Sequence, residues 1–238
     1  MSDTIPSSLG RALRSLKRVM VTPELIIALT VAVVCGAISA KAANLHIIDG
    51  DTLTIGDATY RLHGIDAPEA GQKCNGPSKP WPCGKLVTEE LIRLTEGKEV
   101  RCNNRGMDDY DRVLAVCTAG DIELNDTLVR RGFAWAFIKF SDDYVAAAKE
   151  AREAKRGIWI APTQTAWDYR AERWEVAAQQ APEGCPIKGN ISKNGHIYHA
   201  PWSPWYTRTK VSLEKGERWF CSEREALDAG WRAPMWGR

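Results

Sequence analysis

The chain has 238 residues, of which 44% are hydrophobic and 26% are charged, and its formal net charge is +2. This composition predicts one globular domain with an additional segment, or two small domains, and it excludes an extensively disordered chain. The net charge is too small to indicate a nucleic-acid partner by itself, so evidence for such a partner has to come from a site.

The segment 1–42 has the pattern of an export signal. A basic region precedes an apolar run from Leu25 to Ile38, and Ala40-Lys41-Ala42 is a small-residue pattern that signal peptidase cleaves. The run is shorter than the about 20 residues of a membrane span, although Glu24 beside it leaves an uncleaved membrane anchor as the alternative. We therefore expect an exported protein (periplasmic, secreted or anchored outside the cytoplasm) that contacts a membrane only through this segment if it is uncleaved.

Residues 44–162 contain the signals of a first folded domain. Apolar and polar residues alternate in the stretch 44–64, where Asp49-Gly50-Asp51 and Gly56-Asp57 mark turns between expected strands. After a loop rich in proline and glycine, a helix is indicated by apolar residues at the spacing of one helix face, namely Val87, Leu91 and Leu94. Two more strands are expected near Val100–Cys102 and Val113–Cys117.

Two further helices are expected in this domain. Asn125 or Asp126 is predicted to cap the first, and Ser141 or Asp142 is predicted to cap the second, which ends before Gly157. Five strands with one helix between the third and the fourth favour an α+β fold around a small barrel.

A linker and a small module are expected after this domain. The segment 163–183 is rich in Ala, Glu, Gln and Arg and is predicted to form a helical linker. The segment 184–238 is predicted to be a small disulfide-containing α+β module. Its basic and aromatic residues could stack nucleic-acid bases, and the alternative is that the aromatic residues pack against the barrel.

The cysteines predict disulfides. Of the seven cysteines, Cys35 lies in the export signal, and an even number of six in an oxidising compartment indicates a disulfide framework. Among 15 possible connectivities, we expect the pairs of nearest neighbours, which are Cys74 with Cys83, Cys102 with Cys117, and Cys185 with Cys221.

A zinc site is the alternative use of the last two cysteines. Its ligands would be Cys185 and Cys221 with His196 and His199, but the chain lacks the CxxC spacing of common zinc sites. His63 alternates within an expected strand and is predicted to be structural.

Three short stretches could together carry chemistry, namely Ile48–Thr52, Tyr60–Glu69 and Asp108–Arg112. Alone, each is typical of a turn or of a solvated strand end. Together they offer carboxylates and arginines, the groups that phosphodiester hydrolysis needs. Carboxylate oxygens bind Ca²⁺ at about 2.3–2.6 Å, the cation polarises a phosphate oxygen, a carboxylate activates water, and arginines stabilise the charge of the transition state.

The order Asp-Gly-Asp-Thr, then Arg-Leu-x-x-x-Asp-x-Pro-Glu, then Asp-x-Tyr-x-Arg resembles the staphylococcal nuclease family. The likeness covers about residues 44–160 and includes Val129–Ala134 and Arg156–Trp159. It implies a five-stranded OB-type β-barrel with three helices, and calcium-dependent hydrolysis of DNA or RNA with little sequence specificity.

The resemblance also implies roles for individual residues. Asp51 and Asp66 correspond to the calcium carboxylates, Ala67 to a ligand that binds through its backbone carbonyl, and Asp49 to a supporting carboxylate. Glu69 corresponds to the general base, and Arg61 and Arg112 to the phosphate-binding arginines. Tyr110 and Phe140 are expected to contact the nucleotide.

Some positions depart from the family pattern. Asp111 stands where glycine is usual and adds negative charge near the phosphate site, and Ile138 and Phe140 stand about where the best-known member has tyrosines. The loop 70–83 differs as well, so substrate preference is expected to differ. A monomer is expected, and the alternative functions are a catalytically silent OB-fold nucleic-acid-binding protein or an envelope-attached protein.

Overall fold

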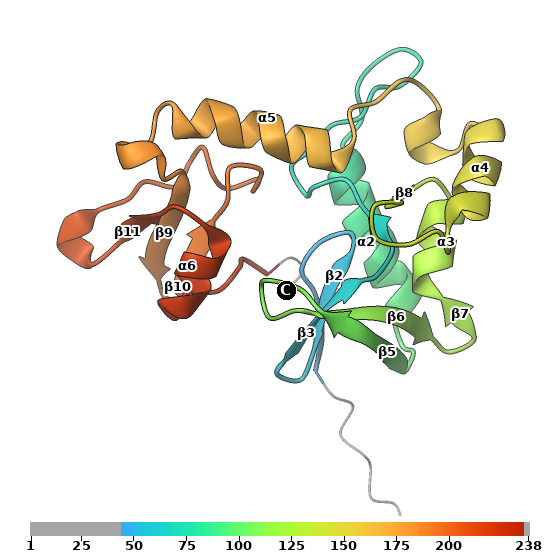
Figure 1. Cartoon of the computed structure of the whole chain (residues 1–238), viewed down its shortest axis with the longest axis horizontal. Helices are drawn as coiled ribbons and strands as arrows, with labels where there is room; N and C mark the ends of the chain where they lie inside the picture. Colours follow the sequence, from blue (N-terminus) through green and yellow to red (C-terminus); the bar gives the residue numbers. More distant parts are fainter. Residues whose placement is uncertain (1–43, 236–238) are drawn as a thin grey trace, which may run out of the picture. The chain divides into compact units, whose positions relative to one another are not determined.

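A mixed β-sheet forms the centre of the first domain in the computed structural model, which describes residues 44–235 (Figure 1). Its main strands are β1 (Leu45–Ile47), β2 (Thr52–Ile55), β3 (Ala58–Leu62), β5 (Val100–Met107) and β6 (Val113–Ala119). They follow the order β1-β2-β3-β6-β5, with the short β7 (Ile122–Glu123) paired to β6. β3 and β6 run parallel, and the other neighbours run antiparallel. The structure confirms the predicted α+β class, and five principal strands in this order suit the OB-type fold.

Sequence periodicity missed a second, two-stranded sheet. It pairs β4 (Ile65–Asp66) with β8 (Trp135–Ala136). Strands of two residues are too short to show an alternation of apolar and polar positions. This sheet nevertheless fixes the backbone of Asp66, one of the predicted ligands.

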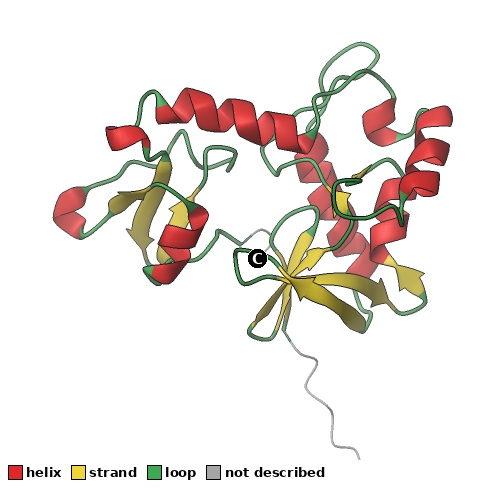
Figure 2. Cartoon of the chain, in the orientation of Figure 1, coloured by secondary structure: helices red, strands yellow, loops and turns green. Residues whose placement is uncertain are grey.

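Three helices accompany this sheet, as predicted (Figure 2). They are α2 (Cys83–Thr95), α3 (Leu124–Arg130) and α4 (Val145–Glu153). The predicted apolar face of α2 is buried, because Val87 and Leu91 are fully inaccessible and Leu94 is nearly so. Burial of such a side chain contributes about 1.5–3 kcal/mol, and this face packs with β2, β3 and α3 in one hydrophobic core.

The predicted helix caps are wrong. Asn125 lies inside α3, where its side chain accepts a hydrogen bond from the Cys117 N–H and donates to the carbonyls of His63 and Ala115. An amide that donates and accepts can bridge strands in this way, which a local cap pattern does not reveal. At α4 the N-cap is Tyr144, without a side-chain cap.

The helix α5 (Ala166–Ala178) lies within the predicted linker. It begins at Thr165, whose hydroxyl accepts a hydrogen bond from the Asp168 N–H. This N-cap satisfies one of the N–H groups that a helix start leaves unpaired.

The C-terminal residues form the small α+β module that was predicted. The elements are the 3₁₀ helices η2 (Pro182–Gly184) and η3 (Leu213–Lys215), the strands β9 (Ile187–Ser192), β10 (Gly195–His199) and β11 (Arg218–Phe220), and the helix α6 (Glu223–Asp228). The sheet order is β10-β9-β11. The module has a hydrophobic core of its own, which contains Ile187, Phe220 and Trp231.

The structure joins the same three cysteine pairs that the sequence favours: Cys74–Cys83, Cys102–Cys117 and Cys185–Cys221. The last pair removes two thiolates from the zinc alternative. His196 stacks on Trp231 with ring centroids 4.8 Å apart.

The expected export signal, 1–42, lies outside the described residues. Within residues 44–235, no helix combines the length and apolar character needed to cross a bilayer.

His199 of β10 makes the stability of the module dependent on pH. Its side chain is buried, and burial, reinforced by the charges of Lys188 and Arg208, lowers its pKa to about 4. An unfolded histidine has a pKa near 6.5, so between these values the unfolded chain binds a proton that the folded chain does not. Stability therefore falls as the pH falls through this window.

When the pH is lowered from about 7.5 to about 5, the free energy of unfolding should fall by about 2 kcal/mol less in the variant His199→Gln than in the wild type. Urea unfolding at both pH values, followed by circular dichroism, measures this difference. His196→Gln is the matched control, because His196 lies exposed on the same strand. An identical pH dependence in the wild type and His199→Gln would contradict the assignment.

Candidate active site

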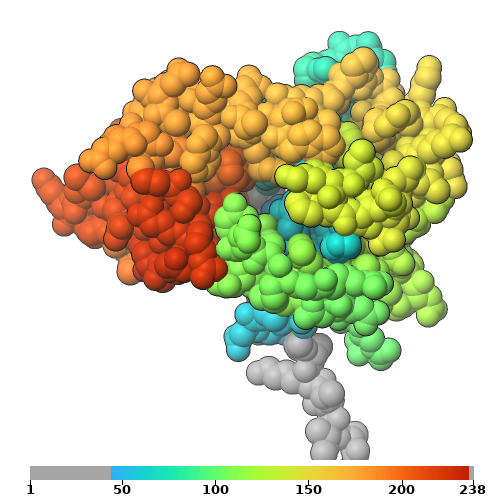
Figure 3. Space-filling model, in the orientation of Figure 1, coloured from blue at the N-terminus to red at the C-terminus, as the bar shows by residue number. Residues whose placement is uncertain are grey.

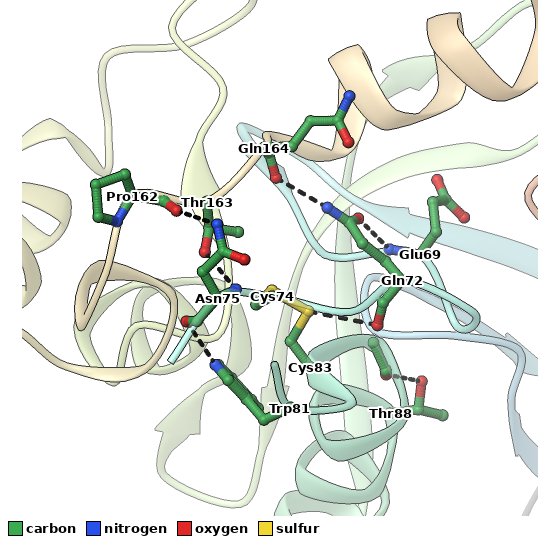
Figure 4. The surroundings of a disulfide bond; sticks show 11 residues. Glu69, Gln72, Cys74, Asn75, Trp81, Cys83, Thr88, Pro162, Thr163 and Gln164 are labelled. Atoms are coloured by element: carbon green, nitrogen blue, oxygen red, sulfur yellow. Dashed lines mark hydrogen bonds between the residues drawn. A yellow bond between two sulfur atoms is a disulfide. The ribbon is translucent and has the colours of Figure 1, made fainter. Parts of the chain in front are cut away.

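Glu69 lies in a loop, next to Gln72, which bonds to its backbone (Figure 4). The N–H of Glu69 donates to Oε1 of Gln72 at 3.1 Å, and the N–H of Gln72 donates to the carbonyl of Glu69 at 2.7 Å. The Gln72 side chain is buried and donates through Nε2 to the carbonyl of Gln164 at 2.9 Å. Gln72 thereby fixes the backbone from which the Glu69 carboxylate projects.

The Cys74–Cys83 disulfide joins the segment that follows Gln72 to the first residue of α2. Asn75 ties the loop to the segment before α5, because its Nδ2 donates to the carbonyl of Pro162 at 2.6 Å. Gly84 lets α2 pass close to the backbone of Glu69, since a Cβ there would lie 1.7 Å from the carbonyl oxygen of Glu69. Only glycine permits this approach.

Asp51 and Asp66 converge on one guanidinium group. Nη2 of Arg61 lies 2.8 Å from Oδ1 of Asp66 and 3.4 Å from Oδ2 of Asp51. The β2–β3 register, which pairs Thr52 with Arg61, places Arg61 beside Asp51. Both carboxylates are buried, so the two predicted ligands face one small volume.

The remaining contacts of Asp51 hold it in place. Its Oδ1 accepts a hydrogen bond from the Thr52 hydroxyl, and its Oδ2 accepts one from the Ala67 N–H, both at 3.0 Å. Asp49 does support the turn, since its Oδ1 accepts a hydrogen bond from the Asp51 N–H at 3.0 Å.

Burial and neighbouring charges set the protonation of these acids. Burial works to raise the pKa of Asp51, but Arg61 and the Ala67 N–H outweigh it, so this pKa lies below its ordinary value. Burial, reinforced by Asp51, raises the pKa of Asp49 to about 7. Burial also raises the pKa of Glu69 to about 8, although Arg170 opposes the shift. The site therefore requires cations near its carboxylates to keep them ionised.

Arg170 of α5 belongs to this site, and sequence reasoning missed it. Its Nη1 lies 2.7 Å from Oε1 of Glu69 and 3.1 Å from Oδ1 of Asp66, and its Nη2 lies 2.9 Å from Oδ2 of Asp66. Asp66 precedes it by 104 residues, so no local motif could have connected them.

Arg112 is oriented by Asp108. The Oδ2 of Asp108 accepts from Nε of Arg112 at 2.7 Å, and its Oδ1 accepts from the Arg112 N–H at 3.0 Å. The guanidinium also lies 5.1 Å from the ring centroid of Tyr110. The spacing of four residues was a usable signal for Asp108, but the sequence analysis gave it no role.

The negative charge that Asp111 was expected to add near the phosphate site has a partner in the structure. The Asp111 carboxylate forms an ion pair of 2.8 Å with Arg224 of α6. Its backbone has a φ of 58°, in the left-handed region where glycine is favoured. This explains why glycine suits the position, while Arg224 compensates the charge of the aspartate.

The predicted catalytic residues Arg61, Glu69 and Arg112 line one cavity of about 1230 Å³. Tyr110, Phe140 and Arg170 line the same cavity, together with Trp174, Trp202 and Trp205 from the C-terminal part of the chain. Figure 3 shows the surface hollowed between the green, yellow-green and orange segments. Phe140 is 60% exposed and packs edge-on against Phe137, so it offers an accessible ring at this cavity.

The donor atoms at Asp51 and Asp66 fit a hard cation. Carboxylate oxygens and a backbone carbonyl such as that of Ala67 are the ligands that Ca²⁺ prefers. Between residues 44 and 235, no cluster of three or more His, Cys, Asp or Glu side chains is arranged for metal binding. A cation here would therefore take two carboxylates, the carbonyl and water molecules.

An uncharacterised endonuclease of Haemophilus influenzae is 32% identical over 151 residues, which are 60% of this chain and 80% of that protein. The sequence model described as staphylococcal nuclease homologue matches residues 59–161. The chain belongs to the staphylococcal nuclease family. A second model, described as ArfC, matches residues 172–233.

Two other relatives differ in the fraction of their own length that matches this chain. The succinoglycan biosynthesis protein ExoI of Rhizobium meliloti is 30% identical over 58% of this chain and 74% of its own length. The staphylococcal-like nuclease CAN1 of Arabidopsis thaliana is 26% identical over 48% of this chain and 33% of its own length. Both matches include about half of the chain or more, and Arg170 lies between the segments matched by the two family models.

The variant Asp108→Asn should lower kcat/KM for nucleic-acid cleavage about tenfold, because an amide holds the Arg112 guanidinium less strongly than a carboxylate does. Initial rates on single-stranded DNA measure the effect. Asp109→Asn removes the same charge from the neighbouring exposed position and should retain activity. Equal rates for the two variants would show that Asp108 does not position Arg112.

Proposed function

We propose that this protein is a calcium-dependent phosphodiesterase that hydrolyses DNA or RNA with little sequence specificity. The observation that carries the proposal is the placement of Arg61, Glu69 and Arg112 around one cavity, beside the converging carboxylates of Asp51 and Asp66. Membership of the family, with relatives named endonuclease and staphylococcal-like nuclease, supports it.

The two arginines would hold the phosphate. Arg61 is anchored by Asp51 and Asp66, and Arg112 is anchored by Asp108, so both guanidinium groups are oriented before substrate binds. Their remaining N–H groups can donate to phosphate oxygens and stabilise the negative charge that grows in the transition state. Tyr110 and Phe140 would contact the nucleotide at the same cavity.

Glu69 would act as the general base. Its carboxylate reaches the cavity from a backbone that Gln72 holds in place. It can accept a proton from the attacking water only when it is ionised, a state that burial disfavours and nearby cations favour. A calcium ion, when bound by Asp51, Asp66 and the Ala67 carbonyl, supplies positive charge and polarises a phosphate oxygen.

We further propose that the protein acts as an exported monomer. Three disulfides within residues 44–235 support an oxidising compartment, because reducing compartments keep cysteines as thiols. The segment 1–42 would supply the export signal or an anchor.

The variant Glu69→Gln should lower kcat about 10²–10⁴-fold, because the amide cannot accept the proton of the attacking water. Cleavage of single-stranded DNA and of RNA measures the rate, and filter binding shows that substrate is still held. Glu89→Gln is the control, since this exposed residue of α2 pairs only with Lys85. Full activity of Glu69→Gln would refute the mechanism.

Removal of calcium should abolish cleavage. An excess of EGTA is expected to stop digestion of plasmid DNA and RNA, and calcium added beyond the chelator is expected to restore it, because the phosphate site depends on the cation's charge. Gel assays of the purified chain measure both steps. Cleavage that continues at the same rate in EGTA would argue against a calcium enzyme.

A further inference from the structure

Arg170 lies outside the segments matched by either family model, yet it bonds directly to two residues of the site. Its fork of donors spans Glu69 and both oxygens of Asp66, with distances of 2.7 to 3.1 Å. The side chain is 22% exposed, whereas that of Asp66 is fully buried. Arg170 is thus a cation that reaches buried carboxylates from the solvent-accessible side.

These contacts occupy the oxygens that a metal would need. Oδ1 of Asp66 accepts from Arg61 and Arg170, and Oδ2 accepts from Arg170. A carboxylate offers about four lone-pair sites, so three of those of Asp66 are already taken. A divalent cation on Asp66 would also lie within a few ångströms of the Arg170 guanidinium, and the two like charges would repel strongly in a buried site.

The same contacts compensate the negative charge of two acids of the site, Asp66 and Glu69. Without Arg170, the carboxylates of Asp66 and Glu69 would lie close together with too little positive charge beside them. Such uncompensated charge is costly in a buried environment. Arg170 pairs with both of them at once. A divalent cation could supply the same compensation.

Arg61 is less suited to such an exchange. It lies within β3, and it also bonds to Asp51, so its contacts connect both carboxylates across the sheet. Arg170 bonds to Asp66 and Glu69 from a separate helix, α5, without a contact to Asp51, and its side chain lines the cavity.

We propose that Arg170 competes with calcium for Asp66, and that its guanidinium leaves Asp66 when calcium binds. Arg170 then sets the calcium affinity of the enzyme, because each binding event must displace its guanidinium. This inference rests on the calcium site of the proposed function.

The test is calcium binding to the purified chain without nucleic acid, measured by isothermal titration calorimetry. Arg170→Gln removes the competing charge and should bind calcium at least tenfold more tightly than the wild type. Arg170→Lys keeps the charge but loses the two-pronged contact, and should fall between them. Circular dichroism and thermal melting verify that each variant is folded.

Arg173→Gln is the matched control. It removes the same charge from the same helix, but among residues 44–235 Arg173 donates to the carbonyl of Pro201 and to no carboxylate. Its calcium affinity should equal that of the wild type. A gain shared by Arg173→Gln and Arg170→Gln would indicate a general charge effect and overturn the inference.

The outcomes separate this inference from the proposed function. If the wild type binds calcium and cleaves nucleic acid, but Arg170→Gln binds calcium no more tightly, only the role of Arg170 is wrong. If Arg170→Gln does not fold, an affinity of Arg170→Lys equal to or below that of the wild type overturns the inference. A wild type that neither binds calcium nor cleaves in its presence refutes the calcium enzyme itself.

Discussion

The site depends on arginine side chains that compensate the negative charge of buried carboxylates. Four carboxylates, those of Asp49, Asp51, Asp66 and Glu69, lie among the guanidinium groups of Arg61, Arg112 and Arg170. Buried ions are tolerated only when they are paired and hydrogen-bonded. Much of the surrounding structure serves this pairing: the β2–β3 register brings Arg61 to Asp51, β4 fixes Asp66, and α5 brings Arg170.

Local sequence signals were sufficient where structure and chemistry are local. The apolar spacing of Val87, Leu91 and Leu94 identified α2, and alternation with turn residues identified the first strands. The order of the three motifs also predicted that Arg61, Glu69 and Arg112 belong to one site. That prediction required the family resemblance, because each motif alone is also typical of an ordinary turn.

Sequence reasoning failed where a side chain has distant or unexpected partners. Asn125 bridges strands instead of capping its helix, since an amide can satisfy several backbone groups at once. Gln72 donates to the carbonyl of Gln164, and Arg170 donates to Glu69, contacts that arise only when the loop and the segment of α5 fold together. Such contacts carry no fixed spacing along the chain, so a pattern search cannot find them, whereas Asp108 stands four residues before Arg112 and could have been found.

The Cys74–Cys83 bridge joins the segment that follows Glu69 and Gln72 to the first residue of α2. A newly made chain in a reducing compartment lacks this covalent link, so hydrogen bonds alone hold the loop until the thiols are oxidised. Under the proposed export, this covalent link would form only after the chain has reached an oxidising environment. The proposed activity would degrade the DNA and RNA of the cell that makes the protein. This order of maturation would separate the synthesis of the protein from its activity.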